Sequence, residues 1–361
     1  MDTSESLPLA ASAPLAEPPA AADSGLLRRL YRAMALTRAI DREALALQRQ
    51  GVLPAYVQVL GQEAAQVGSA AAFDPARDFA FPTYRELGAA MAWGVDPVGY
   101  LASHRALWHG GLWDPRAARF APVNAVVGGP VTHAVGWALG ARLDGTDGCA
   151  LAYFGDGASS QGDVHEAMNT AGVWGLPVVF FCQNNRWALS VPTEEQVAGG
   201  SVAARAAGYG IAGERVDGND AVAVHAAVRR AVERARSGGG PTVVEADTYR
   251  RAPHSTSDDP TRYRDRSEEA HWAARDPLEL TRRHLLAAGA ADAEWIAAAD
   301  DAARRGAREA ADAVSALPEP GGEEMFAHVF ARPTATLREQ QSQWREWREY
   351  QVEYQEVAGR D

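Results

Sequence analysis

The chain has 361 residues, which is enough for one large α/β domain or two smaller domains with a real hydrophobic core. Its formal net charge of −12 argues against a nucleic-acid-binding surface, and all 35 basic residues are arginine. No apolar run approaches the roughly 18 residues of a membrane span, so no transmembrane helix is expected. Cys149 and Cys182 stand inside apolar runs, which predicts buried reduced thiols, as in a cytoplasmic enzyme.

The N-terminal segment 1–24 is rich in alanine, proline and serine and contains no arginine. A transit peptide needs basic residues, and a signal peptide needs a charged start followed by a continuous apolar run. Neither pattern is present, so we expect a disordered tail. A main domain is expected at 25–320, and a C-terminal helical extension at 321–361.

The first part of the main domain has helical periodicity. Apolar residues recur at helical spacing over residues 26–50, and two shorter helices are expected at 62–72 and 84–93. Residues 121–143 form a glycine-rich loop that enters a helix of small residues.

The stretch 149–185 predicts a strand, a turn, a helix beginning near Ser159 and a second strand. This is a βαβ unit whose parallel strands are buried on both faces. The pattern continues with a strand within 203–220, a helix at 221–238 and a strand at 241–250. We therefore expect an α/β fold with a mostly parallel sheet and helices on both faces.

The last third of the chain is mainly helical by its pattern. Residues 276–316 are alanine-rich and are expected to be helical. The segment 336–355 carries aromatic residues at spacings of three and four, which favours a packing face over a cofactor site. These aromatic residues are Trp344, Trp347, Tyr350 and Tyr354.

Small and oxygen-bearing residues end both strands of the predicted βαβ unit. Gly155, Asp156 and Gly157 end the first strand, and Asn184 and Asn185 end the second. Either group alone is typical of a turn, but ligands of parallel sheets bind beyond the carboxyl ends of the strands. Carboxylate and amide oxygens suit Mg²⁺, and the start of the following helix offers N–H groups to an anion. Together they predict a metal–diphosphate site.

This spacing resembles the thiamin diphosphate signature. From about residue 26 to the C-terminal helix, the chain resembles the α subunit of the decarboxylating component (E1) of 2-oxo acid dehydrogenase complexes. The resemblance rests on LQRQGVLPAY, GQEAAQVGSAAAFD, PTYRELG, GYGIAGERVDGND, HSTSDDPTRYR and LREQQ. The branched-chain members are the most similar, through VGSAAAFD and HSTSDD. The resemblance implies the thiamin diphosphate-binding fold.

The resemblance also implies roles for individual residues. Mg²⁺ would be bound by Asp156, Asn185 and the main-chain oxygen of Trp187. Thiamin diphosphate would be bound by Tyr84, Arg85, Ala125, Val127, Gly155, Gly157, Ala158, Gln183 and His254, and His254 would be the catalytic residue. The surrounding loop would be ordered by Arg250, Asp258, Tyr263 and Arg264, and it carries Ser255, which matches a phosphorylation site of mammalian relatives.

Two positions depart from the family pattern. Segment 125–130 lacks the Thr and Gln that hold a potassium ion in branched-chain members, which argues against such a site here. Gln183 stands where some relatives have Arg. Glutamine can donate a hydrogen bond to a phosphate but cannot neutralise it, so more of that task falls to Arg85, the metal and the helix end.

The function implied is oxidative decarboxylation of a branched-chain 2-oxo acid, or alternatively of pyruvate, with acyl transfer to a lipoyl-bearing E2 component. A β subunit would complete an α2β2 enzyme, because in this family it supplies the glutamate that activates the cofactor's pyrimidine ring. Neither a nucleic acid nor a membrane is an expected partner.

Two other functions compete with this reading. An NAD-dependent dehydrogenase is suggested by residues 208–213, which fit G-x-G-x-x-G. A helix precedes that segment and a strand follows it, whereas the fingerprint needs the reverse order. The other rival is a non-catalytic paralogue, against which the intact Asp156, Asn185 and His254 argue.

Overall fold

The computed structural model describes residues 23–105, 111–318 and 322–358. Segment 1–22 of the expected tail lies outside the described residues. The chain divides into two compact units, one ending at Ser315 and the other beginning at Ala316.

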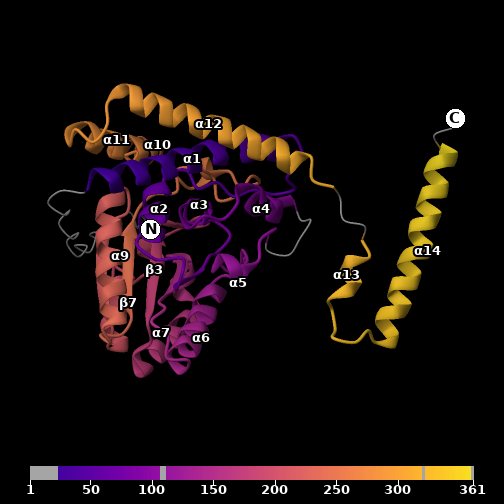
Figure 1. The fold of residues 1–361 in the computed structure, drawn as a ribbon, viewed down its shortest axis with the longest axis horizontal. Helices are drawn as coiled ribbons and strands as arrows, with labels where there is room; N and C mark the ends of the chain where they lie inside the picture. Colours follow the sequence, from indigo (N-terminus) through magenta and orange to yellow (C-terminus); the bar gives the residue numbers. More distant parts are fainter. Residues whose placement is uncertain (1–22, 106–110, 319–321, 359–361) are drawn as a thin grey trace, which may run out of the picture. The chain divides into compact units, whose positions relative to one another are not determined.

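A five-stranded parallel sheet forms the centre of the first unit (Figure 1). The strand order is β1-β2-β3-β7-β6, so every carboxyl end lies at the same edge of the sheet. This confirms the expected α/β fold. The strands are β1 (Phe79–Phe81), β2 (Ala150–Gly155), β3 (Val178–Asn184), β6 (Ala212–Asp217) and β7 (Thr242–Asp247). The sequence did not predict the short edge strand β1.

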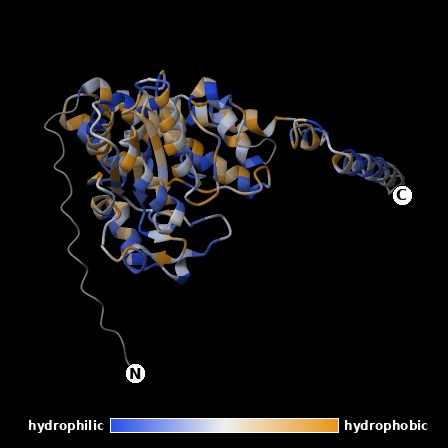
Figure 2. Cartoon of the chain, turned by 90° about the horizontal axis from the view of Figure 1, so that it is seen from below, coloured by the Kyte–Doolittle hydropathy of each residue, from blue (hydrophilic) through white to orange (hydrophobic). Residues whose placement is uncertain are grey.

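Helices cover both faces of the sheet because its central strands are apolar on both sides. On β2, Leu151 and Tyr153 pack in a cluster with α9, whereas Ala152 and Phe154 pack with α6 and α7. Figure 2 shows hydrophobic residues concentrated in these strands. The helices are α6 (Gly129–Leu143), α7 (Gly162–Trp174) and α9 (Ala221–Arg236).

A further layer is built on the N-terminal helix α1 (Ser24–Arg49), which packs along α12 and α11. The predicted helix 276–316 is two helices, separated at Gly289, whose φ is +60°. The remaining helices of this unit are α2 (Glu63–Ala70), α3 (Leu87–Trp93), α4 (Pro97–Ala102), α5 (Pro115–Ala118), α8 (Thr193–Gln196), α10 (Arg266–Ala274), α11 (Pro277–Ala287) and α12 (Ala293–Ser315).

The second unit consists of α13 (Glu324–Ala327) and α14 (Ala335–Ala358). Trp344 packs against Phe326, with ring centroids 5.8 Å apart, but Trp347 and Tyr350 are exposed. Of the expected aromatic packing face, Trp344 therefore packs within this unit, whereas Trp347 and Tyr350 do not. Across the described residues of both units, no helix is long and apolar enough to cross a membrane.

The segment 208–213, which fits G-x-G-x-x-G, does not lie between a strand and a following helix as NAD binding requires. A 3-10 helix, Ala203–Tyr209, is followed directly by β6. The order is helix then strand, so this segment cannot place a helix N-terminus on a dinucleotide phosphate.

The segment before α2 is fixed against the end of β7 by a close backbone approach at Gly61. The φ of Gly61 is +96°, and a Cβ there would lie 2.4 Å from the Tyr249 carbonyl oxygen. Thr248 Oγ1 donates to the Gly61 carbonyl at 3.0 Å, and Arg251 N donates to Leu60 O at 3.1 Å. Only glycine meets both the backbone angle and the space.

We predict that Gly61→Ala lowers the free energy of unfolding by about 3 kcal/mol or more, because it adds a backbone clash to left-handed strain. Gly51→Ala is the matched control, since its φ is +79° with no heavy atom within 4 Å of a Cβ. Strain alone should cost about 1–2 kcal/mol there. Denaturant titration measures both, and equal losses would contradict the role assigned to Gly61.

Candidate functional site

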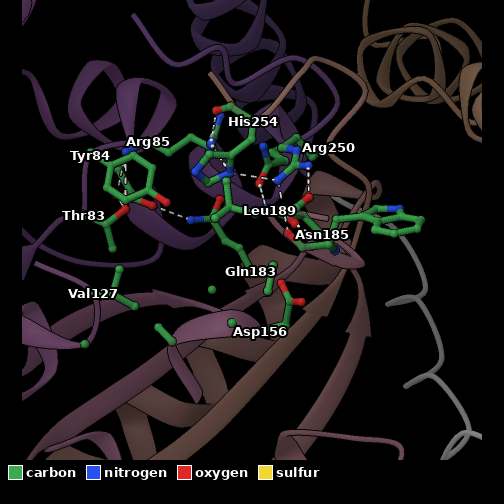
Figure 3. A pocket seen from close by; sticks show the side chains of 18 of the residues that line it. Thr83, Tyr84, Arg85, Val127, Asp156, Gln183, Asn185, Leu189, Arg250 and His254 are labelled. Atoms are coloured by element: carbon green, nitrogen blue, oxygen red, sulfur yellow. Dashed lines mark hydrogen bonds between the residues drawn. The ribbon is translucent and has the colours of Figure 1, made fainter. Parts of the chain in front are cut away.

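A cavity of about 250 Å³ lies at the carboxyl ends of β1, β2, β3 and β7. It brings together most of the residues that the sequence predicted for the site (Figure 3). These are Tyr84, Arg85, Val127, Gly155, Asp156, Gly157, Ala158, Gln183, Asn185, Trp187, Arg250 and His254. Five predicted residues do not line it, namely Ala125, Ser255, Asp258, Tyr263 and Arg264.

Asp156 is a buried carboxylate at the end of β2. Burial raises its pKa above the ordinary value, and hydrogen bonds, first that of Thr193, oppose this rise. The Thr193 hydroxyl lies 2.9 Å from Asp156 Oδ2. A carboxylate in this setting is stabilised in its charged form by a cation placed beside it.

Asn185 follows the neighbouring strand β3 and is also buried. Its Nδ2 donates to Gln62 Oε1 at 3.1 Å, and its Oδ1 accepts from Trp187 N at 3.3 Å. The main-chain oxygen of Trp187 accepts from Arg250 Nη1 at 3.1 Å. The residues expected to bind a metal therefore offer one carboxylate, one amide oxygen and one main-chain oxygen, all of the hard type that Mg²⁺ prefers.

No group of three His, Cys, Asp or Glu residues that could hold a metal occurs in the described part of the chain. The set above contains a single residue of those types. A site of this composition suits a cation that brings its own further oxygen ligands, as Mg²⁺ does with phosphates.

The turn after β2 differs from the expected helix start. Residues Gly157–Ser160 form a 3-10 turn, and α7 begins only at Gly162, because Gln161 has an extended backbone with ψ 138°. Ser159 Oγ donates to Asp156 O at 2.6 Å and stabilises the turn. Gly157 is required here, since a Cβ would lie 2.8 Å from that of Ala188. The turn, and not the first turn of α7, faces the cavity.

Gln183 lines the cavity and belongs to a buried polar network in its wall. Its Nε2 donates to Glu86 Oε1 at 2.6 Å, and its Oε1 accepts from Gln66 Nε2 at 3.0 Å. Glu86 also accepts from the Thr83 hydroxyl at 2.5 Å. One N–H of Gln183 is left for a ligand, because a carboxamide has two.

Sequence reasoning missed several residues that build this wall, above all Gln62, Gln66, Glu86 and Thr193. A signal for the first two is visible in hindsight. They stand four residues apart, Gln62 at the N-cap of the short helix α2 and Gln66 within it, and both are completely buried. Polar side chains at i and i+4 on a buried helix face need partners, which a site can provide.

His254 lies between two guanidinium groups. Its Nδ1 is 3.0 Å from Arg250 Nη1 and 3.5 Å from Arg85 Nη2. Because a guanidinium only donates, Nδ1 accepts and the ring proton sits on Nε2. Burial, followed by the charges of Arg85 and Arg250, lowers the pKa of His254 to about 4. The imidazole is therefore neutral at pH 7.

The loop around His254 is held by a ring of hydrogen bonds. Asp258 Oδ2 accepts from His254 N at 2.7 Å and from the Tyr263 hydroxyl at 2.5 Å. Arg250 Nη2 donates to the Tyr263 oxygen at 3.2 Å, and Arg264 Nη1 donates to Ala252 O at 3.1 Å. Arg250 and Asp258 thus contact both His254 and Tyr263, and Arg264 holds the loop at Ala252.

Ser255 stands outside this ring. It is half-buried, and its Oγ lies 3.1 Å from Ser257 Oγ. Its hydroxyl therefore contacts the neighbouring Ser257 and not the residues that hold His254.

Apolar side chains stand at the mouth of the cavity. Val126 is 69% exposed and Val127 is 47% exposed, although both line the cavity. Ala125, two residues before Val127, does not reach it. Exposed apolar groups beside a polar cavity are typical of a surface that receives a ligand or a partner.

Known proteins with similar sequence share one family. The family described as Dehydrogenase E1 component matches residues 31–323. The 3-methyl-2-oxobutanoate dehydrogenase subunit alpha of Mycobacterium tuberculosis is 44% identical over 319 residues, covering 88% of this chain and 86% of the relative. The 2-oxoisovalerate dehydrogenase subunit alpha of Bacillus subtilis is 38% identical over 312 residues, covering 84% and 94%. The pyruvate dehydrogenase E1 component subunit alpha of Bacillus cereus is 40% identical over 260 residues, covering 72% and 70%.

We predict that His254 titrates near pH 4 and that Arg250→Gln raises this pKa, because the variant removes a positive charge beside the imidazole. NMR titration of the imidazole signals measures it. His225 on α9 is the matched control, since its pKa is also lowered to about 4, mainly by burial, and Arg250 is not among its causes. A wild-type His254 with an ordinary pKa of about 6.5 would contradict the assignment.

Proposed function

The chain belongs to the Dehydrogenase E1 component family, and on this premise we propose that it is the α subunit of a branched-chain 2-oxo acid dehydrogenase E1. The family is thiamin diphosphate-dependent. The observation that supports the proposal most is the cavity where Asp156 and Asn185 meet beyond two adjacent parallel strands. The residues proposed as oxygen ligands and the turn proposed to face the diphosphate line this same cavity.

The cofactor would bind as its Mg²⁺ complex. Asp156, the Asn185 side chain and the Trp187 main-chain oxygen would hold the metal, and Gly157 and Ala158 of the 3-10 turn would face the diphosphate. Arg85 and Arg250 line the same cavity and supply positive charge. The buried Asp156, whose pKa is raised, and the two guanidiniums beside His254 are groups that such a ligand would stabilise.

When bound, thiamin diphosphate supplies a nucleophilic carbon and an electron sink for the loss of CO₂. The protein's own residues then position the substrate. His254 is neutral and carries its proton on Nε2, so it can donate a hydrogen bond to an oxygen of the 2-oxo acid. Arg250, Asp258, Tyr263 and Arg264 would keep the loop of His254 ordered, and Val127 would contact the cofactor.

A β subunit is part of the proposal. Among the described lining residues Glu86 is the only glutamate, and its carboxylate already accepts from Thr83, Gln183 and the Arg85 N–H. The glutamate needed to activate the pyrimidine ring would therefore come from a partner chain. A lipoyl-bearing E2 component would receive the acyl group.

The branched-chain substrate is favoured over pyruvate by the relatives. The 3-methyl-2-oxobutanoate dehydrogenase subunit is the more identical and matches a larger share of the chain than the pyruvate dehydrogenase subunit does. We also propose a cytoplasmic location, because Cys149 and Cys182 are both free and buried, as in a reducing compartment.

The metal site is tested by Asp156→Ala and Asn185→Ala in the assembly with the β subunit. Each should weaken thiamin diphosphate binding about 100-fold or more in the presence of Mg²⁺, because a ligand of the metal is lost. Calorimetry measures binding, and circular dichroism checks the fold. Asp163→Ala is the control, since this exposed carboxylate on α7 does not line the cavity. Unchanged affinity in both site variants would refute the site.

The activity is tested by decarboxylation assays with 3-methyl-2-oxobutanoate and with pyruvate. We expect no turnover by the purified chain alone and turnover once the β subunit is added, with the higher kcat/KM for the branched substrate. Robust turnover without the β subunit would overturn the partner proposal. A preference for pyruvate would favour the pyruvate dehydrogenase alternative.

A further inference from the structure

Gln62 is a buried side chain at the cavity with a donor that has no partner. It is completely buried and lines the cavity wall. Its Oε1 accepts from Asn185 Nδ2, but its Nε2 is sealed from solvent and makes no hydrogen bond within the described residues. A buried donor without a partner is unfavourable unless a ligand satisfies it.

The orientation of both carboxamides follows from a third group. The Trp187 N–H can only donate, and it lies 3.3 Å from Asn185 Oδ1. Asn185 must therefore turn its oxygen toward Trp187 and its Nδ2 toward Gln62. Gln62 in turn must present Oε1 to Asn185, which leaves its Nε2 as the free donor.

The backbone holds Gln62 in place for this contact. It occupies the N-cap position of α2, yet its side chain makes no capping bond to that helix. Gln62 N donates to Val59 O at 2.9 Å, and Gly61 N donates to Glu63 Oε2 at 2.9 Å. Glu63 is itself paired with the buried Arg38. A residue at a helix start normally caps its own helix, whereas Gln62 is directed across to the end of β3.

We propose that Gln62 is a positioning residue for the cofactor site. It orients Asn185 so that Oδ1 can bind the divalent cation, and its Nε2 donates to an oxygen of the diphosphate. This inference rests on the proposed function. It goes beyond the metal ligands, because Gln62 acts on the metal only through Asn185.

The two tasks of Gln62 are separated by two variants. Gln62→Met removes both the acceptor for Asn185 and the free donor. Gln62→Glu keeps an acceptor for Asn185 but removes the donor and adds a negative charge, which repels an anionic diphosphate. Gln58→Met is the control from the same segment, since that side chain donates to Asp41 and does not line the cavity.

The experiment measures binding of Mg²⁺ and of inorganic diphosphate, separately and together, to the α–β assembly by calorimetry. We expect Gln62→Met to weaken the binding of Mg²⁺ and of diphosphate about 10- to 100-fold. Gln62→Glu should weaken inorganic diphosphate about tenfold or more while Mg²⁺ binds at least as well as in wild type. Gln58→Met should leave both affinities unchanged.

Wild-type affinities for both ligands in Gln62→Met would overturn the inference. If that variant does not fold, Gln62→Glu decides, and undiminished diphosphate binding there overturns it. Asp156→Ala separates this outcome from failure of the proposed function. If Asp156→Ala loses binding while the Gln62 variants bind normally, only the role of Gln62 is refuted. If all the variants bind normally, the cofactor site itself is refuted.

Discussion

The parallel pairing of β2 with β3 is the constraint on which the site depends. Gly155 stands opposite Gln183 in this pairing, so Asp156 and Asn185 leave the sheet next to each other. Their short polar side chains are buried, and each needs a partner within hydrogen-bond reach. Thr193 meets this need for Asp156, and Gln62 meets it for Asn185. The rest of the wall is arranged around these two positions.

The remainder of the cavity shows how a polar site is kept rigid in an apolar core. Gln183 connects Glu86, just after the edge strand, with Gln66 on α2, and Gln66 donates to Arg85 O at 2.6 Å. These contacts join the segment after the edge strand β1, the central strand β3 and the helix α2. Because every link is buried, a change at one residue leaves another without a partner, so the wall responds as a unit.

The sequence predicted the parts of the site that follow directly from strand pattern. The two apolar runs that end in Asp156 and Asn185 predicted a βαβ unit, and the parallel sheet confirmed that expectation. Strand β1 could not be predicted in this way, because three residues are too few to show an alternation of apolar and polar side chains. The start of α7 was placed too early, because the break at Gln161 is a backbone feature without a distinctive residue.

Contacts between distant segments were the least predictable. Gln62 and Thr193 contact Asn185 and Asp156, respectively, from elements far apart in the chain, and no local pattern predicts these pairings. The role of His254 came from family resemblance, whereas its neutral state became clear only from its distances to Arg85 and Arg250. Assigning a charge state requires knowing the neighbours in space.

The position of His254 between two guanidinium groups couples ligand binding to protons. Burial lowers the pKa of the imidazole most, and an anion bound between Arg85 and Arg250 would offset the further lowering by their charges. The pKa then rises on binding, so in mildly acidic solution the complex takes up protons from the buffer. The heat of binding measured there includes the ionisation enthalpy of that buffer, and affinity for the anion increases as the pH falls toward the pKa of the bound state.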